Sequence, residues 1–143
     1  MKKYLETVRN HCPLVHNITN YVTVNDVANI ILACGASPIM ADDPEEVQEI
    51  TTICQGLNIN IGTLHKSSIE SMFPGPGKKA NELGHPVLLD PVGAGASTLR
   101  TQTAVKLMQE VRFSVIRGNM SEIKVLSGGM GGARGVDACE TDI

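Results

Sequence analysis

The chain has few aromatic residues and no excess of basic charge, and these two absences limit the partners that it can bind. Its 143 residues include no tryptophan, two tyrosines and two phenylalanines, and its formal net charge is -3. Proteins that bind nucleic acid usually combine a basic surface with aromatic side chains on which bases stack. The composition therefore argues against nucleic acid and anionic membrane surfaces as partners.

Long apolar segments and paired cysteines are also lacking. The sequence has no run of about eighteen apolar residues, and no apolar segment follows its first lysines, so neither a membrane span nor a secretion signal is indicated. The four cysteines lie far apart and include no Cys-x-x-Cys pair, which argues against a zinc cluster and against a disulfide framework. We therefore expect a protein of the reducing cytoplasm.

The sequence does contain a regular alternation of short apolar runs and helical patterns. This alternation predicts one α/β domain over residues 1–143, with a mostly parallel sheet and helices on both faces. The expected strands are 13–18, 37–40, 57–62, 86–89 and 114–116. The expected helices cover about 24–31, 44–54, 65–72, 101–111 and 120–126.

Several short patterns mark where helices begin and end. Asp43-Pro44-Glu45-Glu46 combines a capping carboxylate, a proline at the first helical position and a glutamate three residues after the cap. Asn119 and Glu122 have the same cap and glutamate spacing. Two prolines and two glycines within 74–77 argue against an unbroken helix from 65 to 83, so we expect a kink or loop there.

Polar residues follow two of the apolar runs, at the end of the sheet where open α/β folds bind their ligands. Asp90 follows the run 86–89, where it can hold magnesium or shape a turn before Pro91. Arg117 follows an expected buried strand, where its planar guanidinium suits phosphate oxygens but suits a structural carboxylate equally well. The two positions together favour a functional site.

Other polar or large residues have a structural interpretation that competes with a functional one. Glu122 can close a capping box, Asn20 can cap a helix, and His16 is expected to be a hydrogen-bonded core histidine. Met40 and Val22 are typical of a core.

The glycine-rich segments match no nucleotide-binding fingerprint. Residues 75–79 lack the spacing and the hydroxyl of a P-loop, and residues 93–98 and 129–134 lack the last glycine of the dinucleotide motif. A Rossmann cofactor site is therefore not indicated.

Five short segments are informative when they are taken together and in order. They are Pro13-Leu14-Val15-His16-Asn17-Ile18-Thr19-Asn20, Gly35-Ala36-Ser37-Pro38-Ile39-Met40-Ala41, Asn60-Ile61-Gly62-Thr63-Leu64, Leu89-Asp90-Pro91-Val92-Gly93-Ala94-Gly95-Ala96 and Val115-Ile116-Arg117-Gly118-Asn119. These segments resemble the hydroxyethylthiazole kinase family. The resemblance runs from about residue 5 to the end of the sequence and covers the first half of that family's chain and a little more.

This resemblance implies a ribokinase-like fold and a homotrimer. It also implies transfer of the γ-phosphate of ATP, with Mg²⁺, to the hydroxyethyl group of 4-methyl-5-(2-hydroxyethyl)thiazole, a step of thiamine biosynthesis and salvage. The resemblance implies that Arg117 contacts ATP and that Asp90 and Glu122 lie beside the metal and the phosphates. The positions that the resemblance assigns to the thiazole pocket are Asn20, Val22, Met40 and Gly62.

The chain departs from the family in two places. The family's anion hole, Gly-Thr-Gly followed by Cys or Asp, does not occur in residues 1–143, so no catalytic residue is assigned. Pro74-Gly75-Pro76 stands where the family has a continuous helix, with a one-residue insertion. We therefore expect little or no turnover from these residues alone, since a single anion-stabilising donor contributes about 10²–10³ in rate.

Two alternative functions stay open. One is a non-catalytic thiazole-binding fragment, and the other is a related kinase of the same fold for another small alcohol.

Overall fold

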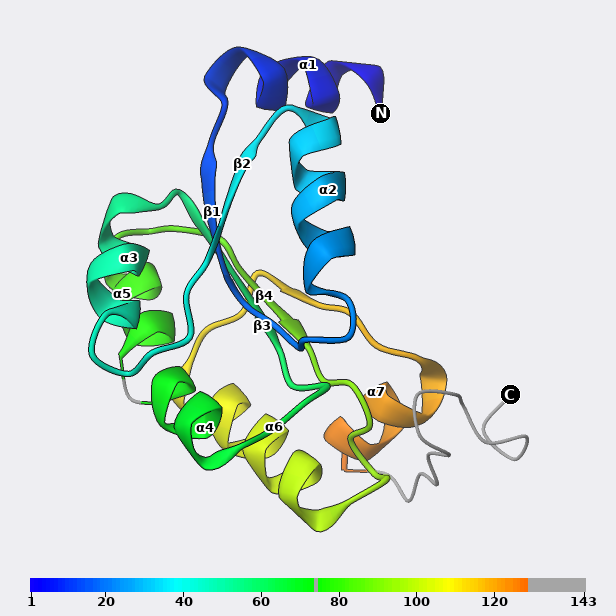
Figure 1. The fold of residues 1–143 in the computed structure, drawn as a ribbon. Coiled ribbons are helices and arrows are strands. Elements are labelled where there is room, and N and C mark those ends of the chain that lie inside the picture. Colours follow the sequence, from blue (N-terminus) through cyan, green and yellow to red (C-terminus); the bar gives the residue numbers. More distant parts are fainter. Residues whose placement is uncertain (74, 129–143) are drawn as a thin grey trace.

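Five parallel strands form one sheet at the centre of the computed structural model, which describes residues 1–73 and 75–128 (Figure 1). The strands lie in the order β2-β1-β3-β4-β5. Their bounds are β1 Leu14–Ile18, β2 Ser37–Met40, β3 Gly56–Asn60, β4 Val87–Asp90 and β5 Val115–Ile116. The helices of the described ranges are α1 Lys2–His11, α2 Val24–Cys34, α3 Val47–Ile53, α4 Lys66–Met72, α5 Pro76–Glu82, α6 Thr98–Glu110 and α7 Met120–Leu126. The predicted α/β class and parallel sheet are confirmed.

One face of the sheet carries the buried core. Ile18 pairs with Ile59 and Ile59 with Leu89 in the strand register, so these three side chains form a continuous apolar row. Helices α3, α4, α5 and α6 contribute the opposing side chains, and burial of this apolar surface is the main source of stability. The opposing side chains include Val47, Met72, Ala80, Ala104 and Leu107.

The opposite side of the sheet is less completely covered. Figure 1 shows α1 and α2 on the side of the strands that faces away from α3 and α5, and neither α1 nor α2 has a buried residue. An apolar cavity of about 320 Å³ lies at the amino ends of the strands, where Val15, Leu88 and Val115 are part of its wall. The two faces of the sheet therefore differ strongly in packing.

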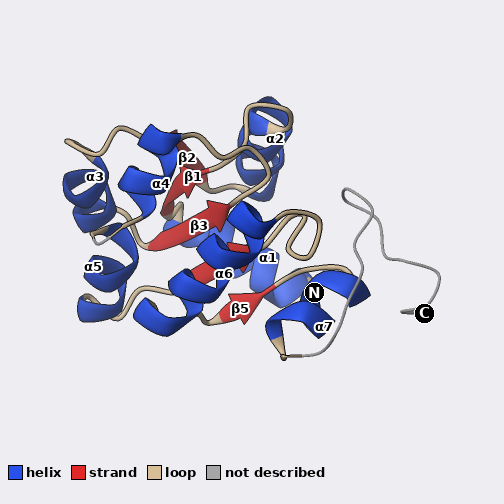
Figure 2. Cartoon of the chain, turned by 90° about the horizontal axis from the view of Figure 1, so that it is seen from below, coloured by secondary structure: helices blue, strands red, loops and turns tan. Residues whose placement is uncertain are grey.

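Strand β5 is an exposed edge, and this corrects one expectation. Val115 and Ile116 are 51% and 37% exposed, so Arg117 does not follow a buried strand. The reason is that β5 pairs only with β4 among the described residues, through two residue pairs. Figure 2 shows β5 at the outer end of the row of strands, beside α7.

Most predicted boundaries hold to within a few residues. Gly35 ends α2 with a φ of 93°, as a glycine after a helix commonly does. The interruption after residue 72 is confirmed, because α4 ends at Met72 and α5 begins separately at Pro76. No helix within the described ranges is long and apolar enough to cross a membrane.

Four helices differ from the sequence prediction. Helix α5 was not predicted as a separate helix, and it begins within the segment 74–77 where a kink or loop was expected. Helix α1 was not predicted, and α3 begins at Val47 because the Asp43 carboxylate and carbonyl accept the N–H groups of the next residues in a turn. Helix α6 begins at Thr98, three residues earlier than expected, because the Ser97 hydroxyl accepts the N–H of Arg100 at 3.3 Å. Polar side chains thus decided two of these boundaries.

Candidate functional site

A cavity of about 490 Å³ opens at the carboxyl ends of β1, β3, β4 and β5. All the predicted site residues except Met40 line it. Parallel strands bring their carboxyl ends to one edge of the sheet, which is why residues far apart in sequence meet there. The lining residues are Asn20, Val22, Thr23, Asn60, Gly62, Asp90, Val92, Arg117, Gly118, Asn119 and Glu122.

Asp90 and Arg117 form an ion pair in the wall of this cavity. Asp90 is the last residue of β4 and Arg117 follows the neighbouring β5, and Arg117 Nη1 donates to Asp90 Oδ2 at 2.9 Å. The Arg117 side chain is 75% exposed, whereas that of Asp90 is 14% exposed. Solvent screens such a pair, so the ion pair contributes little to stability. The N–H donors of the exposed Arg117 guanidinium stay accessible to an anion.

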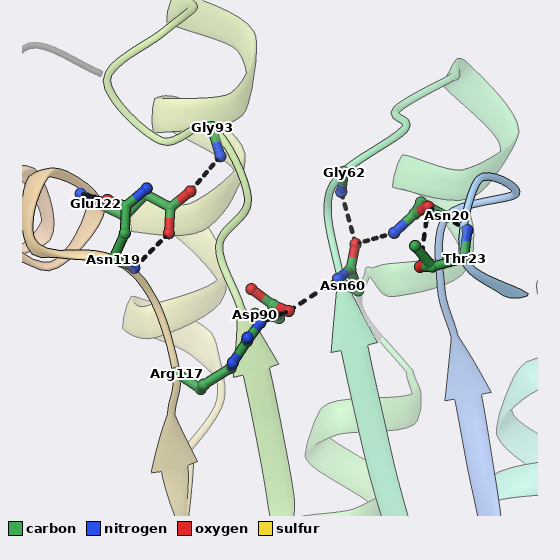
Figure 3. Close-up of polar contacts among 9 residues, drawn as sticks. All are labelled: Asn20, Thr23, Asn60, Gly62, Asp90, Gly93, Arg117, Asn119 and Glu122. Atoms are coloured by element: carbon green, nitrogen blue, oxygen red, sulfur yellow. Dashed lines mark hydrogen bonds and ion pairs between the residues drawn. The ribbon is translucent and has the colours of Figure 1, made fainter. Parts of the chain in front are cut away.

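Asn60 connects this ion pair to the other side of the cavity (Figure 3). Its Nδ2 donates to Asp90 Oδ2 at 3.0 Å, and its Oδ1 accepts from Asn20 Nδ2 at 2.9 Å and from the Gly62 N–H at 2.8 Å. Asn60 was not among the residues predicted for the site. Its position as a polar residue at the end of a strand, like that of Asp90, was the signal that could have found it.

Asn20 orders the turn between β1 and α2. Its Oδ1 accepts the N–H groups of Val22 at 3.0 Å and Thr23 at 3.1 Å, and the Thr23 hydroxyl at 3.3 Å. The expectation that Asn20 caps the helix is wrong: Thr23 is the N-cap of α2, and Asn20 binds N–H groups of the turn that precedes the helix. The same side chain lines the cavity, so the structural and functional interpretations coincide at this residue.

Glu122 is buried and held by main-chain groups. Its Oε2 accepts the Asn119 N–H at 2.8 Å, while Asn119 Oδ1 accepts the Glu122 N–H at 2.9 Å, which confirms the expected capping box. Its other oxygen, Oε1, accepts the Gly93 N–H at 2.7 Å. Glu122 thus ties the start of α7 to the loop that follows β4.

The two carboxylates differ in what they can offer to a metal ion. Three of their four oxygens accept hydrogen bonds from the protein, whereas Asp90 Oδ1 accepts none within the described residues. Those residues contain no cluster of three or more His, Cys, Asp or Glu side chains that could hold a metal. Magnesium is commonly held by one or two carboxylates together with waters and substrate phosphates. The site therefore suits a magnesium ion that arrives with a nucleotide.

Arg100 is a second residue that the sequence did not reveal. Its Nη2 donates to the Gly62 carbonyl at 2.7 Å and its Nη1 to the Val92 carbonyl at 3.4 Å, which links the loops after β3 and β4. Gly93 has a φ of 74°, which favours glycine, and a Cβ at this position would lie 2.3 Å from Arg100 Nη1 and displace that side chain. Arg100 precedes the helix expected over 101–111, and the sequence gave no sign of this role, because the reach of its side chain depends on the tertiary fold.

Met40 lies apart from the other predicted site residues. It lines a separate cavity of about 170 Å³, together with Thr19 and Tyr21. The loop between β1 and α2 contributes to both cavities, because Asn20, Val22 and Thr23 line the larger one and Thr19 and Tyr21 line the smaller one.

His16 is a structural residue, as expected. It is fully buried, its Nε2 lies 2.8 Å from the Ala41 carbonyl, and its Nδ1 lies 2.8 Å from the Thr51 hydroxyl. A carbonyl can only accept, so Nε2 carries a proton. Burial lowers the pKa of His16, and the bond to Ala41 opposes this in part. The ring is therefore neutral at pH 7.

The sequence matches a model of the hydroxyethylthiazole kinase family over residues 5–143. A protein of Clostridium acetobutylicum named hydroxyethylthiazole kinase is 68% identical over 142 residues, which are 99% of this chain and 52% of that protein. A protein of the same name from Clostridium beijerinckii is 63% identical over 96% of this chain and 50% of its own length. The chain thus spans about half the length of the curated relatives that it matches.

A solved structure shows the same fold. The structure of a hydroxyethylthiazole kinase protein from Pyrococcus horikoshii matches with a TM-score of 0.84 and 45% sequence identity. The match covers 90% of this chain and 51% of that one. The similarity in sequence and the similarity in structure therefore agree.

Proposed function

The chain belongs to the hydroxyethylthiazole kinase family, and we propose that it serves the transfer of phosphate from ATP to the hydroxyethyl group of 4-methyl-5-(2-hydroxyethyl)thiazole. The main support is that Asp90, Arg117 and a set of small or amide side chains surround one cavity of about 490 Å³. Phosphoryl transfer needs little covalent chemistry from a protein. It needs two substrates held in line and developing charge neutralised.

We assign the thiazole alcohol to the part of the cavity formed by Asn20, Val22 and Gly62. A side chain at position 62 would meet Asn60 Oδ1 at 2.9 Å and Asn20 Nδ2 at 3.1 Å, so glycine keeps this wall open. Met40 is proposed to contact the thiazole ring from the adjoining cavity, across the loop that contains Val22.

We assign the phosphates of ATP to the opposite part of the cavity. Arg117 is proposed to bind phosphate oxygens, since most of its guanidinium is exposed and one of its nitrogens holds Asp90 in place. Asp90 Oδ1 is proposed to hold Mg²⁺, with Glu122 shaping the adjacent wall through Gly93 and Asn119. Bound Mg²⁺ supplies neutralisation of the charge on the transferring phosphate.

The assembly and location are also proposals. Tyr21 and Val22, beside the two cavities, are 70% and 73% exposed. A neighbouring subunit of a homotrimer would cover these side chains and complete the thiazole pocket. We propose that this assembly acts in the cytoplasm.

A second candidate function is a thiazole-binding fragment with little or no turnover. It is favoured by the presence of Asn20, Val22 and Gly62 in a sequence without the Gly-Thr-Gly-Cys or Gly-Thr-Gly-Asp motif. Loss of an anion hole removes transition-state stabilisation but leaves ground-state contacts in place.

Calorimetry and a coupled assay of ADP release separate these candidates. The purified chain is titrated with the thiazole alcohol and with magnesium ATP, and the mixture is then tested for ADP. Binding of both ligands with slow ADP release is the expected result, and fast release would contradict the low turnover that we propose. Failure to bind either ligand would contradict the proposed function of this chain. Tighter binding of another alcohol, such as pyridoxine, would favour a related kinase.

A further inference from the structure

We infer that Asn60 is a positioning residue that couples the alcohol side of the cavity to its phosphate side. The inference rests on the proposed function, because it concerns the two substrates of that site. Asn60 ends β3, which lies between β1 and β4 in the sheet, and it is 8% exposed. It is therefore a buried amide placed between the residues assigned to the two substrates.

The surrounding donors and acceptors fix the orientation of this amide. The Gly62 N–H can only donate, so the atom that faces it at 2.8 Å must be the Oδ1 of Asn60. The other end of the amide then presents Nδ2 to Asp90 Oδ2 at 3.0 Å. Exchanging the amide oxygen and nitrogen of Asn60 would break the bonds to Gly62 and to Asp90, and the loss of each buried hydrogen bond is costly.

The resulting chain of hydrogen bonds crosses the carboxyl edge of the sheet. It runs from Arg117 to Asp90, then through Asn60 to Asn20, as Figure 3 shows. Asn20 in turn accepts the N–H groups of Val22 and Thr23 in the turn that precedes α2. A ligand that moves the Asp90 carboxylate therefore changes the position of Asn60 and the shape of the turn that carries Val22. Contiguous hydrogen-bond networks of this kind transmit coupling between sites.

The hydrogen bonds of Asn60 require a donor that faces Asp90 and an acceptor that faces Gly62 and Asn20. Aspartate at position 60 still accepts from Asn20 and Gly62, but it places a second oxygen about 3.0 Å from Asp90 Oδ2, where a donor is needed. Asn60→Asp thus breaks the hydrogen bond to Asp90, on the phosphate side of the cavity, and keeps the bonds to Asn20 and Gly62, on the alcohol side. Asn58 provides the matched control, because it lies two residues earlier on β3, donates to Asn17 Oδ1 at 3.1 Å and does not line the cavity.

The first experiment measures coupling by calorimetry on the full chain. Magnesium ATP is expected to raise the affinity for the thiazole alcohol about fivefold or more, and the alcohol must raise ATP affinity by the same factor. In Asn60→Asp this factor should fall to about one, whereas Asn58→Asp should keep it. An unchanged coupling factor in Asn60→Asp would overturn the inference.

A second experiment decides the inference without either ligand. The side-chain amide signals of Asn20 are recorded by nuclear magnetic resonance with and without Asp90→Asn, first in the native background and then with Asn60→Ala. Asp90→Asn is expected to shift these signals only when Asn60 is present. Equal shifts in both backgrounds would show that Asn60 carries no link, even if the proposed function holds. If neither ligand binds but the shifts depend on Asn60, the proposed function fails and the link stands.

Discussion

One polar cluster includes a residue of strand β1 and a second lies at the carboxyl edge of the sheet, and the two use hydrogen bonds for different purposes. The core cluster, made of His16, Thr51 and the Ala41 carbonyl, is buried beneath α3. The edge relay, made of Asn20, Asn60, Asp90 and Arg117, lies at the carboxyl end of the sheet and lines the large cavity.

The difference between these clusters lies in what remains unpaired. In the core cluster both ring nitrogens of His16 have protein partners, so no group is left for a ligand. In the edge relay Asp90 Oδ1 accepts no bond within the described residues, and most of the Arg117 guanidinium faces solvent. A closed cluster stabilises the fold, whereas an incomplete one at a cavity can bind a substrate.

The largest effect should come from removing the core cluster. His16→Ala leaves a cavity and an unpaired Ala41 carbonyl, and we expect it to lower the free energy of unfolding by about 3 kcal/mol. Urea denaturation followed by circular dichroism measures this loss. A loss smaller than that of Arg117→Lys would contradict the contrast between the two clusters.

Glu122 tests whether a carboxylate at the cavity can be structural. In Glu122→Gln one of the two oxygens that accept the Gly93 and Asn119 N–H groups becomes an NH₂ group. We expect a loss of about 2 kcal/mol in the free energy of unfolding, because a buried donor is left without an acceptor. Asp90→Asn is the matched comparison and should cost less, since Asp90 is bound by side chains at an accessible edge. Equal losses would remove the distinction that we draw between the two carboxylates.

Acidification should weaken the fold through the core cluster. Burial holds the pKa of His16 below its ordinary value of 6.5, so the unfolded chain binds a proton more readily than the folded one. The contribution of the neutral His16 ring to the free energy of unfolding is present above pH 6.5. It is lost as the pH falls from 6.5 through the lowered pKa of the folded chain. Unfolding between about pH 7.5 and about pH 5 should show a loss of at most about 1.4 kcal/mol per pH unit from this group. His16→Ala should remove this dependence and His11→Gln, on the exposed helix α1, should keep it.

The smallest effect on stability is expected in the edge relay. Arg117→Lys should change the free energy of unfolding by less than about 1 kcal/mol, because the side chain is 75% exposed. The same variant should weaken ATP binding more than binding of the thiazole alcohol, since lysine cannot present two parallel donors to phosphate. Calorimetry with each ligand measures the two losses. Unchanged ATP affinity would remove Arg117 from the proposed nucleotide site.

Local patterns in the sequence were sufficient for much of the fold. Apolar runs located the five strands, Gly35 marked the end of α2, and the capping box of Asn119 and Glu122 marked the start of α7. These features depend on neighbours within a few residues, so a linear pattern contains them. Helix α1 was missed because most of its residues are polar or charged, although Tyr4, Leu5 and Val8 have the spacing of one helical face.

The candidate site could be predicted only in part. Asp90 and Arg117 were found because polar residues stand out after apolar runs, and the fold brings them within 2.9 Å. Asn60 and Arg100 were not found, because their partners lie as many as 40 residues away along the chain. The position of Met40 in a separate cavity was likewise hidden, since it depends on the path of the loop after β1.

By itself the sequence determined the order of the five strands along the chain, the cap of α7 and the two charged groups at strand ends, because each follows from short-range periodicity and backbone chemistry. Only the tertiary structure decided which groups are partners. The parallel register brings Asn20, Asn60 and Asp90 to one edge, and it leaves β5 with a single neighbour among the described residues. Hydrogen bonds depend on distances of about 3 Å between atoms, and only the folded chain sets those distances.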